Sequence, residues 1–364
     1  MNQHSENQSP LSTSPSPGEV SSLNPNLNTR SNAGGRRSKS VQDYVEGIRN
    51  RDRVVLSQAI TLLESTRNEH QEKARAILDR LLPDTGNSIR VAITGVPGVG
   101  KSTFIESLGT RLIDDGHRLA VLTIDPSSER SKGSILGDKT RMGALASHDD
   151  VYVRPSPTAG TLGGVARKTR ETIFLCEAAG FDVVLVETVG VGQSEVKVRS
   201  MVDFFLLLAL AGAGDELQGI KRGIVEMADA IAINKADGEN RSAAEDARAE
   251  YERALHLLGE TDSGWDPPVL TCSGQTGDGI DEVWQAVEDY QSEMQASGYF
   301  DEQRRRQARH WMYQTIERRL RDDFFSNADV QARRDEIEGA VLDGELSSFA
   351  AAEKLLSVYR DSHT

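Results

Sequence analysis

The sequence predicts a doubly wound α/β domain with a mostly parallel sheet, and two observations indicate this class. Six apolar segments have the length and composition of strands, namely 90–94, 119–124, 183–187, 204–210, 228–233 and 268–272. Several of them are apolar on both faces, which is typical of parallel strands that helices cover on each side. Helical stretches of ten or more residues separate most of these strands, so the alternation predicts one doubly wound domain over residues 88–298.

A polar tail precedes the folded part of the chain. Residues 1–40 are rich in Ser, Asn and Pro and nearly lack large apolar residues, so we expect them to be disordered. The tail has no apolar segment of a secretory signal, and its few arginines are only a weak sign of a transit peptide. We therefore expect a cytoplasmic protein, with a mitochondrial matrix location as the open alternative.

Residues 41–87 form a helical segment by their pattern. Apolar residues recur at spacings of three and four between Val55 and Leu81, and Pro83 and Gly86 then end the helical pattern.

Residues 299–364 differ in composition from the α/β domain. Helical patterns cover 301–323, 327–341 and 347–360, and the first of these is dense in Arg and Glu. Because the segment has too few apolar residues for a core of its own, we expect it to pack on the α/β domain or on a second copy of the chain.

Charge and cysteine content exclude several classes of protein. The 42 basic and 56 acidic residues give a net charge of −14, which disfavours nucleic acid as a partner. No segment approaches the roughly 20 apolar residues that a membrane-spanning helix needs. Cys176 and Cys272 are far apart and lack a CxxC motif, which argues against a disulfide framework or a zinc site.

A phosphate-binding loop follows the first strand. The segment GVPGVGKST matches the pattern GxxxxGK[ST], in which glycines let successive backbone N–H groups point at phosphate oxygens. Lys101 would reach the β- and γ-phosphates, and the hydroxyl of Ser102 would ligate Mg²⁺. A strand before the loop and a helix after it complete the context of a P-loop nucleoside triphosphatase. The predicted phosphate-binding residues are Gly95, Val96, Pro97, Gly98, Val99, Gly100, Lys101, Ser102 and Thr103.

A second motif, NKAD, follows the strand at 228–233 and selects the base. The carboxylate of Asp237 can accept hydrogen bonds from N1–H and the exocyclic amine of guanine. Adenine lacks the N1–H donor and would leave this carboxylate unpaired, so GTP is favoured over ATP. The segment CSGQTGDG would close over the base through backbone N–H groups. The predicted base-binding residues are Asn234, Lys235, Asp237, Ser273, Gly274 and Gln275.

Acidic residues at strand ends are candidate magnesium ligands. Asp125 follows the strand at 119–124, Asp138 lies in the polar segment after it, and Glu187 ends the strand at 183–187. Carboxylates at this edge of an α/β sheet can hold Mg²⁺ directly or through water.

Two further segments resemble switches. In ETVGVGQSE, Gly190 can meet the γ-phosphate through its backbone N–H, but Val191 stands where many GTPases carry the Gln that orients the attacking water. Slow hydrolysis that waits for a partner is the consequence we expect. Gln218 and Lys221 follow the strand at 204–210 and are candidates for a third switch.

Taken together, the motifs resemble those of the MeaB/ArgK-type GTPases, whose human member is the methylmalonic aciduria type A protein. The resemblance covers residues 41–360 and rests on GVPGVGKST, LTIDPSSERSKGSILGDKTRM, ETVGVGQSE, GDELQGIKRGIVEMAD and NKAD in this order. It implies a homodimeric GTPase that is a chaperone of adenosylcobalamin-dependent acyl-CoA mutases, mainly methylmalonyl-CoA mutase. Such proteins gate cofactor loading and protect or reactivate the mutase, and their helical C-terminal arm takes part in the dimer.

The resemblance also implies roles for individual residues. It places Lys101, Glu187, Gln218 and Lys221 in the catalytic and switch machinery, and Ser102, Asp125, Asp138 and Glu187 at the magnesium site.

Three other functions compete with this reading. A nickel metallochaperone GTPase would need Cys or His ligands near the switches, and the sequence has neither a CxxC motif nor a His-rich tract there. A kinase acting on a transport protein would need a second substrate pocket, and NKAD disfavours ATP. A membrane-targeting GTPase would need a basic, methionine-rich module, which the sequence does not contain.

Overall fold

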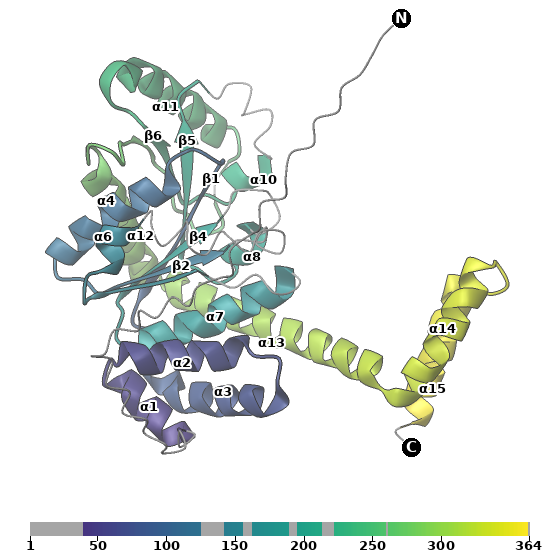
Figure 1. Ribbon diagram of the computed structural model, residues 1–364. Coiled ribbons are helices and arrows are strands. Elements are labelled where there is room, and N and C mark those ends of the chain that lie inside the picture. Colours follow the sequence, from purple (N-terminus) through teal and green to yellow (C-terminus); the bar gives the residue numbers. More distant parts are fainter. Residues whose placement is uncertain are drawn as a thin grey trace, which may run out of the picture. The chain divides into compact units, whose positions relative to one another are not determined.

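The computed structural model describes residues 39–124, 142–155, 162–188, 195–212, 222–259 and 261–362. Within these residues one seven-stranded sheet has the order β3-β2-β4-β1-β5-β6-β7 (Figure 1). The strands are β1 (Ile89–Gly95), β2 (Leu119–Ile124), β3 (Val151–Pro155), β4 (Val183–Thr188), β5 (Phe204–Leu210), β6 (Ala230–Asn234) and β7 (Val269–Thr271). Every pairing is parallel, so the predicted doubly wound class is confirmed.

Strand β1 lies at the centre of this sheet. It pairs with β4 on one side, where Ile93 is opposite Glu187, and with β5 on the other, where Gly95 is opposite Leu208. From β1 the chain passes to β2 and β3 on one side, returns to β4 beside β1, and then continues to β5, β6 and β7 on the other side. This reversal creates a switch point beside β1 at the carboxyl edge. The carboxyl ends of β1, β4, β5, β6 and β7 therefore lie at one edge of the sheet.

Strand β3 was not among the strands that the sequence predicts. It is a short edge strand of five residues, and its last three, Val153, Arg154 and Pro155, are only half-buried. An edge strand needs neither a long apolar run nor two apolar faces, so its signal in the sequence is weak.

Helices cover both faces of the sheet. On one face lie α4 (Lys101–Asp114), α6 (Gly143–Ala146) and α12 (Ile280–Ser297). On the other lie α7 (Leu162–Ala178), α8 (Glu195–Arg199), α10 (Arg222–Val225) and α11 (Arg241–His256). Neighbouring side chains of β1 point to opposite faces of the sheet. Ile93 packs in the cluster with α4, and Ala92 packs in the cluster with α7.

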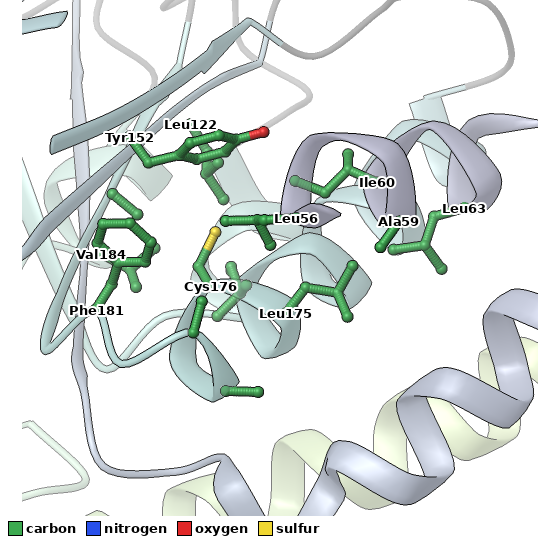
Figure 2. Close-up of a cluster of buried hydrophobic side chains, with 14 of the residues drawn as sticks. Leu56, Ala59, Ile60, Leu63, Leu122, Tyr152, Leu175, Cys176, Phe181 and Val184 are labelled. Carbon is green, nitrogen blue, oxygen red and sulfur yellow. The ribbon is translucent and has the colours of Figure 1, made fainter. Parts of the chain in front are cut away.

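The N-terminal helices pack on the α7 side of this sheet. They are α1 (Val41–Arg49), α2 (Arg53–Glu64) and α3 (Asn68–Leu81), followed by the short turn η1 (Leu82–Asp84). Figure 2 shows Leu56, Ile60 and Leu63 of α2 in one cluster with Leu175 and Cys176 of α7. The break between α1 and α2 has a local cause, because Arg51 has a φ of 64° and Asp52 caps α2 through its side chain.

The C-terminal segment forms three helices, close to the predicted ranges. They are α13 (Tyr299–Ser326), α14 (Ala328–Leu342) and α15 (Ser348–Asp361). Helix α13 contacts the turn before β5, where Trp311 Nε1 donates to the carbonyl of Ser200 at 3.0 Å. Leu342 and Phe349 keep 87% and 84% of their surface exposed, so these helices carry apolar side chains that the described chain leaves uncovered.

A buried ionic network ties α13 to the amino ends of β1 and β5. The guanidinium of Arg304 donates to both carboxylate oxygens of Asp203, at 2.8 and 2.6 Å, and to the carbonyl of Ser88 at 2.6 Å. Asp203 also accepts from the backbone N–H of Arg90 at 2.9 Å, and Arg90 in turn pairs with Glu177 at 2.8 Å. The side chain of Asp203 is fully buried, so this network is screened from solvent.

Arg304 also donates to the carbonyl of Gly86, so its contacts join residues 41–87, 88–298 and 299–364. The division into these three segments stays a prediction. Among the described residues no helix is long and apolar enough to span a membrane.

Replacing Asp203 should destabilise the fold strongly. Asp203→Ala leaves the guanidinium of Arg304 buried without its carboxylate, and we expect a loss of about 3–5 kcal/mol in the free energy of unfolding. Chemical denaturation of the purified chain measures this loss. Glu302→Ala is the control, because it removes an exposed ion pair with Arg306 on the same helix and should cost about 1 kcal/mol or less. Equal effects of the two substitutions would contradict this account of the network.

Candidate functional site

The phosphate loop between β1 and α4 requires glycine at two positions. Gly95 has a φ of 151°, and a Cβ there would overlap the carbonyl oxygen of Leu208. Gly100 has a φ of 98°, and a Cβ there would lie 2.8 Å from Nδ2 of Asn234. Both residues therefore combine a backbone conformation that favours glycine with a close approach to a neighbouring strand. The loop leads directly into the N-terminus of α4, whose unpaired backbone N–H groups favour an anion.

Lys101 lies over this loop. Its ammonium group donates to the carbonyl oxygens of Gly95 at 2.7 Å and Val96 at 3.2 Å. Burial lowers the pKa of Lys101, while the carboxylates of Glu187 and Glu195 act in the opposite direction. The side chain is thus held at the loop by carbonyl groups that phosphate oxygens can replace.

Glu187 and Ser102 form an oxygen-rich pair beside the loop. The hydroxyl of Ser102 donates to Glu187 Oε1 at 3.1 Å, which joins the start of α4 to the end of β4. Behind this pair, the hydroxyl of Thr188 donates to that of Thr94 at 2.7 Å, and both threonines are buried. A hydroxyl and a carboxylate are donors that hard divalent cations such as Mg²⁺ prefer, so the residues present fit that ion.

The side-chain amide of Asn234 connects three loops. Its Nδ2 donates to the carbonyl of Val99 at 2.8 Å, and its Oδ1 accepts from the backbone N–H of Gly274 at 3.0 Å. Lys235, which has a φ of 62°, reaches the same phosphate loop and donates to the carbonyl of Gly98 at 2.8 Å. NKAD therefore holds the phosphate loop and the loop after β7 in a common position.

Ser273, in the loop after β7, holds the side chain of Asp237. The Ser273 hydroxyl donates to Asp237 Oδ2 at 2.5 Å and accepts from the backbone N–H groups of Gln275 at 3.3 Å and Thr276 at 3.1 Å. Ser273 is fully buried, so this one hydroxyl orients a carboxylate and a backbone turn together. The hydrogen bond from Ser273 therefore orients the carboxylate of Asp237, the residue that the sequence predicts to bind the guanine base.

The structure brings most of the predicted site residues to one edge of the sheet. The loop from Gly95 to Thr103, Glu187, NKAD and the turn from Ser273 to Gln275 belong to this set. Asp125, Asp138, Gly190, Val191, Gln218 and Lys221 lie outside the described residues, and their roles stay predictions.

One residue that the sequence analysis did not assign lies close to this site. Glu195 is 1% exposed at the start of α8, and its carboxylate acts electrostatically on Lys101. The signal available in the sequence was a second acid at the end of ETVGVGQSE, in the segment that Glu187 begins. Two carboxylates, from β4 and α8, thus flank the lysine of the phosphate loop.

Comparisons with known proteins agree with this geometry. Residues 56–329 match the family model described as methylmalonyl-CoA mutase-associated GTPase MeaB. A probable GTPase of Mycobacterium tuberculosis is 53% identical over 319 residues, which cover 88% of this chain and 95% of that protein. The mitochondrial methylmalonic aciduria type A homolog of Mus musculus is 46% identical over 321 residues, with 85% and 77% covered.

A solved structure shows the same fold. The crystal structure of a LAO/AO transport system kinase superposes with a TM-score of 0.69 at 38% identity, and the match covers 88% of this chain and 97% of that one.

Replacing Ser273 should weaken guanine nucleotide binding while leaving the fold intact. In Ser273→Ala the carboxylate of Asp237 loses its hydrogen-bond donor, and we expect about tenfold weaker affinity for GDP, which corresponds to about 1.4 kcal/mol. Titration with a fluorescent GDP analogue measures it. Ser263→Ala removes a hydroxyl from another loop, after α11, and should bind GDP like the parent chain. Unchanged affinity in Ser273→Ala would remove this hydroxyl from the base site.

Proposed function

The chain belongs to the MeaB family of GTPases, as its motifs predicted, and on that premise we propose that it serves an adenosylcobalamin-dependent acyl-CoA mutase. In this proposal it hydrolyses GTP to GDP and phosphate, gates cofactor loading, and protects or reactivates the mutase, with methylmalonyl-CoA mutase as the preferred client. The observation that carries the proposal is the joining of the phosphate loop to the base loop through Asn234, in a chain whose family is described as mutase-associated.

In this proposal, residues of the phosphate and base loops would bind the nucleotide. The backbone N–H groups of the phosphate loop and the ammonium of Lys101 would hold the β- and γ-phosphates. The carboxylate that Ser273 orients, Asp237, would accept from N1–H and the exocyclic amine of guanine. An amide nitrogen carries two hydrogens, so Asn234 can hold Val99 with one and reach the purine with the other.

The donors for magnesium come from two elements. Ser102 and Glu187 would hold Mg²⁺, together with Asp125 and Asp138 from the segment after β2. When bound, the ion neutralises charge on the β- and γ-phosphate oxygens. The hydrogen bond between Ser102 and Glu187 would open as both oxygens turn to the ion.

In this proposal the partner mutase controls GTP hydrolysis. Val191 has no group that orients water, so the chain alone positions the attacking water poorly. Gln218 and Lys221 would relay contact with the mutase to the γ-phosphate. The carboxylates of Glu187 and Glu195 oppose the lowering of the Lys101 pKa that burial causes.

A homodimer would cover the apolar side chains of the C-terminal helices. Ile316 and Leu320 on α13 and Leu342 and Phe349 at the α14–α15 turn are exposed, and a second copy can bury them. We place the protein in the cytoplasm, with the mitochondrial matrix as the alternative.

The alternative functions have less support. A nickel site built from the two cysteines is disfavoured, because Cys176 and Cys272 are buried in different hydrophobic clusters. No group of three His, Cys, Asp or Glu side chains within the described ranges is arranged to hold a metal. A kinase function would agree with the description of the compared structure as a transport system kinase, but a kinase that uses ATP would leave Asp237 without a donor.

The preference for guanine can be inverted at Asp237. Asp237→Asn replaces an acceptor by a donor, and we expect the triphosphate preference to change from GTP to xanthosine triphosphate by at least tenfold. Competition binding of the two nucleotides measures the change. Asp278→Asn, in the loop after β7 and paired with the exposed Arg241, should keep the preference for GTP. A variant at Asp237 with the GTP affinity of the parent chain would exclude this carboxylate from base recognition.

Hydrolysis should accelerate on contact with the client. Purified chain alone and chain mixed with methylmalonyl-, isobutyryl- or ethylmalonyl-CoA mutase are compared by phosphate release, and we expect one mutase to raise turnover by at least tenfold. The same mutase should co-purify with the chain in a manner that depends on a non-hydrolysable GTP analogue. Lys101→Ala is the control, because it should remove phosphate release in both mixtures. Equal turnover with and without every mutase would refute partner control.

A further inference from the structure

A cavity lies between α3, α7 and α13, and none of its lining residues belongs to the nucleotide site. It has a volume of about 220 Å³. Its apolar walls come from Leu78 and Leu82 of the N-terminal segment, Phe174 of α7 and Trp311 of α13. The cavity therefore joins three segments that are distant in the sequence.

The guanidinium of Arg170 lines this cavity and forms no ion pair with a described residue. It stacks on two aromatic rings, with its central carbon 5.1 Å from the ring centre of Phe174 and 5.5 Å from that of Trp311. In the part of the chain that the structure describes, no carboxylate lies within 4.0 Å of it. Burial, and then the positive charge of Arg90, lower the pKa of Arg170 to about 10, so it is still protonated at neutral pH.

A second arginine, Arg167, also lines this cavity. The Nε of Arg167 is buried and has no hydrogen-bond partner among the described residues. Its Nη1 lies 3.4 Å from Glu171, a half-buried acid of the lining, and desolvation raises the pKa of that acid. Arg318 also acts on both of these residues. Asp79 is an exposed residue of the lining, so the buried part of the cavity holds an excess of positive charge.

We propose that this cavity binds a small organic carboxylate with a short apolar body. A planar guanidinium that is fixed by stacking presents two parallel N–H groups, which match the two oxygens of a carboxylate. The apolar walls match an alkyl chain of a few carbon atoms, and a bare inorganic oxyanion would leave them without contact. Arg170 supplies the paired donors, and Arg167 adds positive charge to the same lining.

Binding would connect the N-terminal helices to the start of the C-terminal arm. Leu78 and Leu82 belong to the first, Trp311 belongs to the second, and α7 lies between them. A ligand that bridges these segments stabilises their packed arrangement, so the temperature of unfolding should rise with ligand concentration. The proposal is independent of GTP binding, because the two sites share no residue.

The test uses the full chain labelled with 5-fluorotryptophan. The protein has three tryptophans, and of these Trp311 lines the cavity. Sodium butyrate is titrated at constant ionic strength without nucleotide, and Trp311→Phe assigns the resonance. We expect a saturable shift of the Trp311 fluorine signal, and smaller or no shifts at Trp265 and Trp284. Butanol and inorganic phosphate are titrated in parallel and should bind at least tenfold more weakly than butyrate.

Substitutions assign the binding to Arg170. Arg170→Gln should weaken butyrate binding at least tenfold, and Arg170→Lys, which keeps the charge but not the planar fork, should weaken it severalfold. The lysine variant keeps the test valid if the glutamine variant does not fold. Arg305→Gln removes an exposed guanidinium of α13 and should leave the affinity unchanged. No saturable shift with butyrate, equal binding of butanol, tighter binding of phosphate, or unchanged affinity in both Arg170 variants would each overturn the proposal.

Discussion

The side-chain amide of Asn234 is the contact on which the nucleotide site depends. It is nearly fully buried and bonds to Val99 in the phosphate loop and to Gly274 in the loop after β7. A buried amide that lost either partner would leave an unsatisfied polar group, which costs about 1–3 kcal/mol. The two loops are therefore held in one relative position before any nucleotide arrives. The glycine at position 100 follows from the same contact, since a Cβ there would meet this amide.

At the amino ends of the strands, a buried ionic network holds α13 against the sheet. Arg304 brings α13 against the amino ends of β1 and β5, where Asp203 and the carbonyl of Ser88 accept from its guanidinium. The sheet thus has one edge closed by a buried ionic network and one edge where loops remain to bind a ligand. In the proposed homodimer, contacts made by the C-terminal helices would reach β1 and β5 through Arg304 and Asp203.

The site combines fixed and adjustable parts. Backbone geometry and buried hydrogen bonds fix the phosphate and base loops, whereas Ser102, Glu187 and Lys101 are held by partners that a nucleotide or a cation can replace. The proposed carboxylate cavity adds a second place where a small molecule would act on the packing of α7. Since α7 lies directly before β4 in the chain, and β4 carries Glu187, a ligand there would act on an element next to the switch.

The sequence alone determined the phosphate loop, the NKAD motif and the alternation of strands and helices, because each of these depends on residue types at short spacing. The tertiary structure alone decided which loops meet. Asn234 and Val99 are 135 residues apart, and neither is marked in the sequence as the partner of the other. Strand β3 and Glu195 were missed for the same reason, since an edge strand and a buried acid acquire their roles from neighbours. Arg170 reads as an ordinary helix surface residue, and only the packing of α3 and α13 around it forms a cavity.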